Sequence, residues 1–69
     1  MSELPDVAKR HYDLWKFVQT LTLEEISMLI IKRKKDLKYT KEPDEIKRLK
    51  EEIGVLNEGY KLVKRKKED

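Results

Sequence analysis

Residue types that catalyse group transfer are scarce in this sequence of 69 residues. His11 is the one histidine and there is no cysteine, so a nucleophile–base pair would have to join His11 to a serine or threonine, with no third group in the pattern to orient it. Adjacent glutamates occur at Glu24 with Glu25 and at Glu51 with Glu52. Neighbouring side chains on a helix diverge, so neither pair forms an acid–base site. We therefore expect no enzymatic activity, no metal site and no cofactor.

His11 falls near the middle of the apolar face of the first predicted helix. Because an imidazole titrates near neutral pH, one interpretation of His11 is a pH switch or a ligand. The other is a neutral histidine that fills the edge of the core and is hydrogen-bonded to a carbonyl or a carboxylate. We favour the second interpretation, since a single histidine has no companion ligands.

A run of four basic residues at positions 32–35 resembles a nucleic-acid or nuclear-localisation patch. On a helix, four consecutive side chains point in four directions and cannot form one basic face. We therefore expect a solvated collar of positive charge that is partly neutralised by Glu51 and Glu52 of the neighbouring helix.

A second set of cations recurs at steps of three and four residues along the last predicted helix. This lysine ridge consists of Lys47, Lys50, Gly54, Asn57, Lys61 and Lys64, with Arg65 at its end. It covers about 25 Å of helix, enough to meet several phosphates of a duplex, and its small central residues would let a nucleic-acid backbone approach. It carries no aromatic residue and no helix-turn-helix motif. We expect a solvated face, with nucleic-acid contact through its cations as the alternative.

The charge balance gives only weak support for a nucleic-acid partner. The chain has 17 basic and 14 acidic residues, a net charge of +3, and 45% charged residues, which is charge-dense but only mildly basic. Because no run of about 18 apolar residues occurs, we expect no membrane span. The N-terminal residues lack an apolar signal sequence and cysteine is absent, so we expect a cytoplasmic protein.

Two amphipathic segments make up the first half of the chain. A helix is expected over about residues 3–20, with Ser2 as its N-cap and Pro5 in its first turn. Thr22 and Glu25 have the spacing of a capping box, so a second helix is expected over residues 23–39. The first helix has one broad apolar face, which comprises Leu4, Val7, Leu14, Trp15, Val18 and Leu21.

A third helix is expected over about residues 43–66, where Pro43 suits the first helical position. Its apolar residues form a heptad seam that packs against another helix; they are Ile46, Leu49, Ile53, Leu56, Tyr60 and Val63. Gly59 lies beside this seam, and a glycine inside a helix costs up to about 1 kcal/mol relative to alanine. Close packing would offset that cost, so we expect Trp15 or Tyr12 to lie over Gly59.

The short break between the second and third helices predicts that they are antiparallel neighbours. In that arrangement the basic residues 32–35 meet Glu51 and Glu52, and Glu24 and Glu25 meet Lys61. The sequence thus predicts one all-α domain over residues 1–69, with three helices: a long antiparallel helical hairpin packed by an N-terminal amphipathic helix.

The second helix is apolar nearly all round between residues 26 and 31. Ile26 and Ile30 face the hairpin, whereas Met28 and Ile31 point away from it, and one neighbouring helix cannot cover both sets. Since a chain this short has a marginal core, we expect a homo-oligomer, most simply a symmetric dimer, with Met28, Leu29 and Ile31 at the interface.

The function most compatible with these features is a small interaction or regulatory protein, which acts by helix packing with itself and with a protein or other macromolecular partner. A subunit of a larger assembly would have the same sequence features. The alternative is a nucleic-acid-binding accessory protein that uses Lys47, Lys50, Lys61, Lys64 and Arg65.

Overall fold

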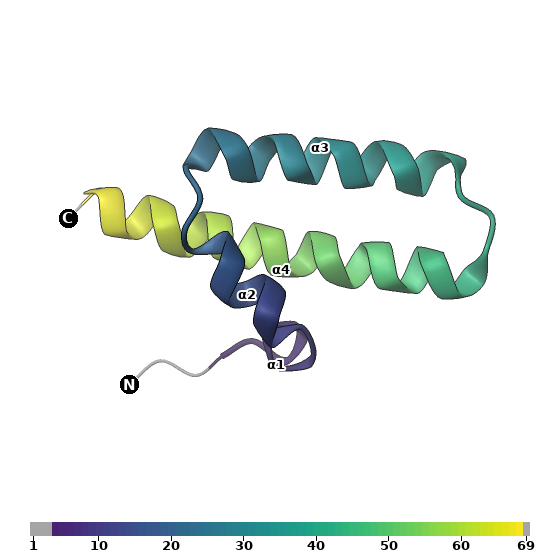
Figure 1. The fold of residues 1–69 in the computed structure, drawn as a ribbon, viewed down its shortest axis with the longest axis horizontal. Helices are drawn as coiled ribbons and strands as arrows, with labels where there is room; N and C mark the ends of the chain where they lie inside the picture. Colours follow the sequence, from purple (N-terminus) through teal and green to yellow (C-terminus); the bar gives the residue numbers. More distant parts are fainter. Residues whose placement is uncertain (1–3, 69) are drawn as a thin grey trace.

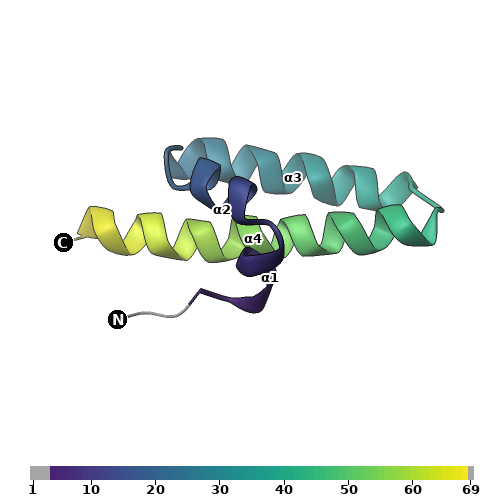
Figure 2. The same cartoon turned by 60° about the horizontal axis from the view of Figure 1, so that its bottom comes forward.

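The computed structural model describes residues 4–68, and these residues form four helices. They are α1 (Asp6–Arg10), α2 (Tyr12–Val18), α3 (Leu23–Tyr39) and α4 (Pro43–Glu68). α3 and α4 lie side by side and antiparallel, while α2 crosses α4 (Figure 1). Figure 2 shows α1 and α2 together over one face of α4. The expectation of an all-α fold is confirmed, but the expected number of three helices is wrong.

The extra helix arises because the segment expected to form one helix is broken at His11. His11 has φ −127° and ψ 54°, outside the helical region. Its N–H donates to the carbonyl of Val7 (3.1 Å) and closes α1, while its own carbonyl accepts from the N–H of Trp15 (2.9 Å) and opens α2. The proposed N-cap Ser2 lies outside the described residues.

Packing explains the break at His11. Because α2 crosses α4, a straight continuation would carry the residues before His11 past α4 into solvent. The turn instead brings α1 back onto α4, where Ala8 is fully buried in a cluster with Trp15 and Val55. The gain from burying these side chains decides against the uninterrupted helix.

The bounds of α3 are set by local chemistry. The Thr22 hydroxyl accepts from the N–H of Glu25 (3.1 Å) and the Glu25 carboxylate accepts from the N–H of Thr22 (2.9 Å), so the predicted capping box is confirmed. At the other end Thr40 is extended, and its hydroxyl donates to Glu45 in the first turn of α4 (2.9 Å). α4 then begins at Pro43, whose missing N–H costs nothing at that position.

The main core lies where α2, α3 and α4 meet. Val18, Ile26 and Leu56, one from each helix, are fully buried there. Partly buried residues of the predicted seam, including Tyr60 and Val63, surround this cluster. The heptad seam of α4 is therefore covered mainly by α3, as the antiparallel hairpin requires.

The predicted contact of the basic residues 32–35 with Glu51 and Glu52 is present in part: Glu52 meets this run, whereas Glu51 is bonded to Arg10 and His11 instead. The guanidinium Nε of Arg33 lies 3.0 Å from the carboxylate of Glu52, and both side chains are only partly exposed. The predicted contact between Lys61 and the glutamates at the start of α3 is wrong. Lys61 Nζ lies 3.9 Å from Glu58 on its own helix instead, and one carboxylate oxygen of Glu25 is used by the capping box.

Gly59 is covered by Val18, so the expectation of Trp15 or Tyr12 over this glycine is wrong. Tyr12 is half exposed on the outer side of α2, and Trp15 packs with Ala8 instead. Val18 is compact enough for the end of α2 to approach the backbone of α4 closely. Gly54 has a looser neighbour in Val7.

These two glycines predict opposite effects of the same substitution. The β-carbon of Gly59→Ala would overlap Val18 Cγ1 and lie 3.2 Å from Val18 Cβ, so we expect a loss of about 1–3 kcal/mol in the free energy of unfolding. The β-carbon of Gly54→Ala would lie 3.7 Å from Val7 Cγ2, an ordinary contact. Helix propensity then dominates, and we expect a gain of about 0.5–1 kcal/mol.

Urea denaturation followed by circular dichroism at the helical band measures both variants against the parent chain. If Gly59→Ala proved as stable as Gly54→Ala, α2 would not pack on α4 as described.

Candidate interaction surface

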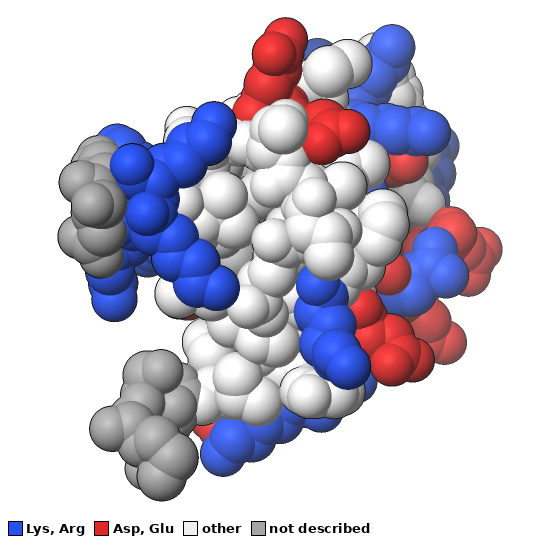
Figure 3. All heavy atoms as spheres, turned by 60° about the vertical axis from the view of Figure 1, so that its left-hand side comes forward, with Lys and Arg blue, Asp and Glu red and all other residues white. Residues whose placement is uncertain are grey.

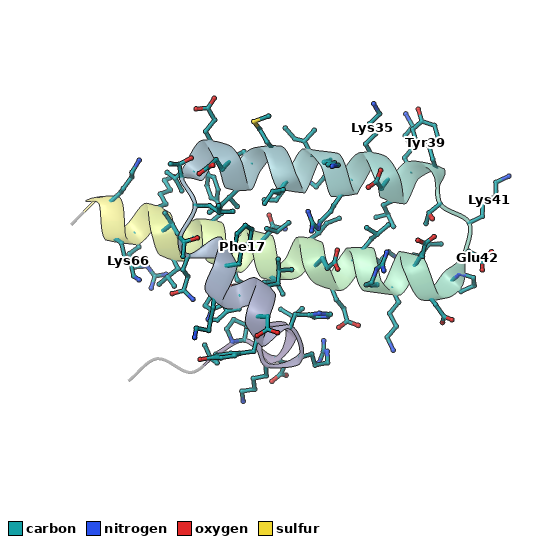
Figure 4. The ribbon with its side chains drawn as sticks, viewed as in Figure 1. Phe17, Lys35, Tyr39, Lys41, Glu42 and Lys66 are labelled. Carbon is teal, nitrogen blue, oxygen red and sulfur yellow. The ribbon has the colours of Figure 1, made fainter. Side chains whose placement is uncertain are left out.

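The side of α3 that faces away from α4 carries large apolar residues. Met28 is 64% exposed, Ile31 65% and Tyr39 69%. With Glu24 and Lys35 they recur at steps of four and three residues, so all five lie on one side of the helix. We call these residues, Glu24, Met28, Ile31, Lys35 and Tyr39, the outer stripe. Figure 4 shows Lys35 and Tyr39 pointing away from α4.

The three interface residues expected from the sequence separate in the structure. Met28 and Ile31 are among the most exposed apolar residues of the described chain. Leu29, by contrast, is half buried and packs on the cluster formed by Val18, Ile26 and Leu56. Leu29 thus belongs mainly to the edge of the core.

Phe17 of α2 is a further large apolar residue at the surface, 55% exposed. It lies with Leu21, Leu29 and Met28 along a shallow groove between α2 and α3, so the apolar surface of the outer stripe continues through Met28 onto α2. Figure 3 shows this end of the molecule as a band of uncharged side chains, with Lys and Arg side chains on its left and both acidic and basic side chains on its right. Helical periodicity alone does not predict this groove, because the break at His11 sets the direction of α2.

The cations of the lysine ridge are all exposed on α4. The centre of the ridge is not open, however, since Val7 of α1 lies over Gly54. The expectation that a nucleic-acid backbone could approach this glycine is therefore wrong. The ridge is divided into Lys47 and Lys50 on one side and Lys61, Lys64 and Arg65 on the other.

His11 forms a cluster with Arg10 and Glu51, which links the break between α1 and α2 to α4. One carboxylate oxygen of Glu51 accepts from Arg10 Nε at 2.9 Å and lies 3.0 Å from His11 Nε2. Because a carboxylate only accepts, His11 Nε2 carries the hydrogen. This is the carboxylate-bonded histidine at the edge of the core that the sequence favoured.

The same contacts lower the pKa of Glu51. The hydrogen bond from Arg10 is the main cause, followed by the hydrogen bond from His11, and both stabilise the ionised carboxylate. The Glu51 side chain is 20% exposed, so the cluster is in contact with solvent and its charges are partly screened.

Other kinds of site are not found in the part of the chain that the structure describes. Residues 4–68 contain no group of three or more His, Cys, Asp or Glu side chains that could hold a metal ion. Over the same residues no helix is both long and apolar enough to cross a membrane. No protein-family model, curated protein or solved structure matches the chain.

The Glu51 cluster predicts a pH-dependent contribution to stability. Since the pKa of Glu51 in the folded state is below its ordinary value of 4.5, its contribution is present above about pH 4.5 and is lost as the pH falls through the lower folded pKa. We expect Glu51→Gln to have a lower melting temperature than the parent at pH 7, with the difference shrinking below pH 4.

Thermal denaturation followed by circular dichroism between pH 7 and pH 2.5 measures this difference. Glu58→Gln is the control, because Glu58 has one distant cation at 3.9 Å, and its pH dependence should follow the parent more closely. A pH-independent difference for Glu51→Gln would contradict the role of the ionised carboxylate.

Proposed function

We propose that the protein is a small non-enzymatic interaction protein, which associates with itself and with a macromolecular partner by packing the outer stripe of α3 against another helix. The observation that carries this proposal is the alignment of Met28, Ile31 and Tyr39, each more than 60% exposed, along one side of a helix. The other side of that helix packs on the core through buried Ile26 and partly buried Leu29 and Ile30. A helix that is apolar on two sides is suited to packing on two sides.

The arrangement of these residues matters more than their number. Single exposed apolar side chains are normal on soluble proteins, but an aligned set that continues into a second apolar groove is typical of a contact surface. Methionine and tyrosine are also residue types enriched at interfaces. Covering a Met or Ile side chain completely contributes about 1.5–3 kcal/mol, so an association that covers both on each copy is favourable.

Self-association is tested by placing charge on the outer stripe. In Met28→Glu with Ile31→Glu the interface would bury unpaired carboxylates, so we expect this variant to remain a monomer at concentrations where the parent chain forms dimers. Sedimentation equilibrium over about 5 μM to 1 mM spans the dissociation constants expected for a contact of this size.

Tyr12→Glu is the matched control, because Tyr12 is a half-exposed aromatic residue on α2 and not part of the outer stripe. It should associate as the parent does. A monomeric parent chain over the whole range would remove the proposal of self-association, and association of the doubly substituted variant would place the contact elsewhere.

A second candidate function is nucleic-acid binding through the two halves of the lysine ridge. The observation that favours it is that Lys47, Lys50, Lys64 and Arg65 are exposed and form no ion pair with the side chains of residues 4–67. Unpaired cations on one helix face can meet the phosphates of a duplex.

This candidate predicts that duplex DNA binds at 50 mM salt and is released at 200 mM salt, because counterion release makes phosphate contacts strongly salt-dependent. We expect Lys61→Glu with Lys64→Glu to weaken binding by at least about tenfold. Fluorescence anisotropy of a labelled duplex measures both effects, and Lys38→Glu with Lys41→Glu, two exposed lysines outside the ridge, is the control for the same change in net charge. Equal weakening by the control would show that net charge and not the ridge binds the duplex.

A further inference from the structure

We infer that the occupant of the outer stripe is a second copy of this chain, with the two α3 helices antiparallel, Met28 packed against Ile31 of the other copy and Glu24 beside its Lys35. This inference rests on the proposed self-association and adds to it the direction and the register of the contact. Three observations support this register: the spacing of the residues in the outer stripe, the charges along α3, and the exposure of the stripe to solvent.

The spacing of the stripe selects one antiparallel register. Glu24, Met28, Ile31 and Lys35 follow one another at steps of four, three and four residues, the a/d pattern of a helix pair. When Met28 faces Ile31 of the second copy, the twofold axis passes between residues 29 and 30. The same axis places Glu24 opposite Lys35 of the second copy. The apolar pair and the charged pair therefore form in one register.

Charge selects the antiparallel direction. The acidic residues Glu24 and Glu25 lie in the first turn of α3, while its exposed cations Lys32, Lys34, Lys35 and Lys38 lie further along and outnumber the one exposed carboxylate there, Asp36. An antiparallel pair sets the acidic end of each helix against the basic part of the other, whereas a parallel pair sets like charges together. Antiparallel helix dipoles add to the same preference.

The two charged residues of the stripe are available for this contact. Within the described residues Glu24 and Lys35 are exposed and form no ion pair. Lys35 and Tyr39 of the outer stripe point away from α4 (Figure 4), and Met28 and Ile31 are 64% and 65% exposed. Helices α1 and α2 pack on α4 (Figures 1 and 2). A second α3 can therefore approach the part of the stripe from Glu24 to Lys35.

The size of the contact sets its expected strength. α3 has 17 residues and is about 25 Å long, so two such helices bury an area at the small end of specific interfaces. We therefore expect a reversible dimer with a dissociation constant in the micromolar range or weaker.

Direction and register are tested with single cysteines, because the chain contains none of its own. Glu24→Cys carrying an isotope label is mixed with unlabelled Lys35→Cys and oxidised gently, and the disulfide-linked dimers are identified by mass spectrometry. The antiparallel register predicts that the mixed 24–35 dimer exceeds both 24–24 and 35–35 dimers several-fold. A parallel pair predicts the reverse, and random collision of equal amounts of the two variants predicts a mixed dimer only twice as abundant as each homodimer; either outcome overturns the inference.

Charge reversal gives a second test that needs no cross-link. Glu24→Lys alone and Lys35→Glu alone each replace two attractive contacts in the dimer by repulsion, so we expect each to raise the dissociation constant by about tenfold. The variant with both substitutions restores opposite charges and should return close to the parent value. Failure of the double variant to recover would overturn the register.

These experiments separate the inference from the proposed function. If the parent chain stays a monomer at about 1 mM, self-association and the antiparallel pair both fail. If it forms a dimer that Met28→Glu with Ile31→Glu abolishes, but the cross-links are 24–24 and 35–35, self-association through the outer stripe stands and the antiparallel register alone is wrong.

Discussion

The whole structure depends on the burial of α4 along two of its sides. α3 covers the side with the heptad seam, and α1 and α2 cover the side that contains Val55. In a chain of 69 residues few side chains are available for a core, so the two small clusters must share the same helix. Leu56 and Val55, adjacent in sequence, each anchor one of them.

Sharing one central helix explains why α3 has an uncovered apolar side. Helix α4 packs on the inner side of α3. Helices α1 and α2 pack on α4 through Ala8, Trp15 and Val18. No further helix remains among the described residues to cover Met28 and Ile31. Met28 and Ile31 are therefore exposed, and they form the apolar surface that supports the proposed association.

The cluster at Glu51 shows how a short chain fixes a change of direction without a large core. One carboxylate oxygen contacts both Arg10 and His11. Arg10 is the last residue of α1, and His11 lies between α1 and α2. The energetic contribution of this cluster is limited by exposure to solvent, but the cluster fixes where the break lies relative to α4. The apolar contacts of Ala8 and Val7 then determine how tightly α1 packs.

The sequence by itself determined the hairpin. The capping box at Thr22, Pro43 at the start of α4 and the heptad seam act over a few residues each, so their spacing alone places α3 and α4 and makes Met28 and Ile31 point away from α4. Only the tertiary structure decided the break at His11, the packing of Val18 over Gly59, the cover over Gly54 and the exposure of Phe17. Those features depend on the angle at which α2 crosses α4, and that angle results from long-range packing that helical periodicity does not encode.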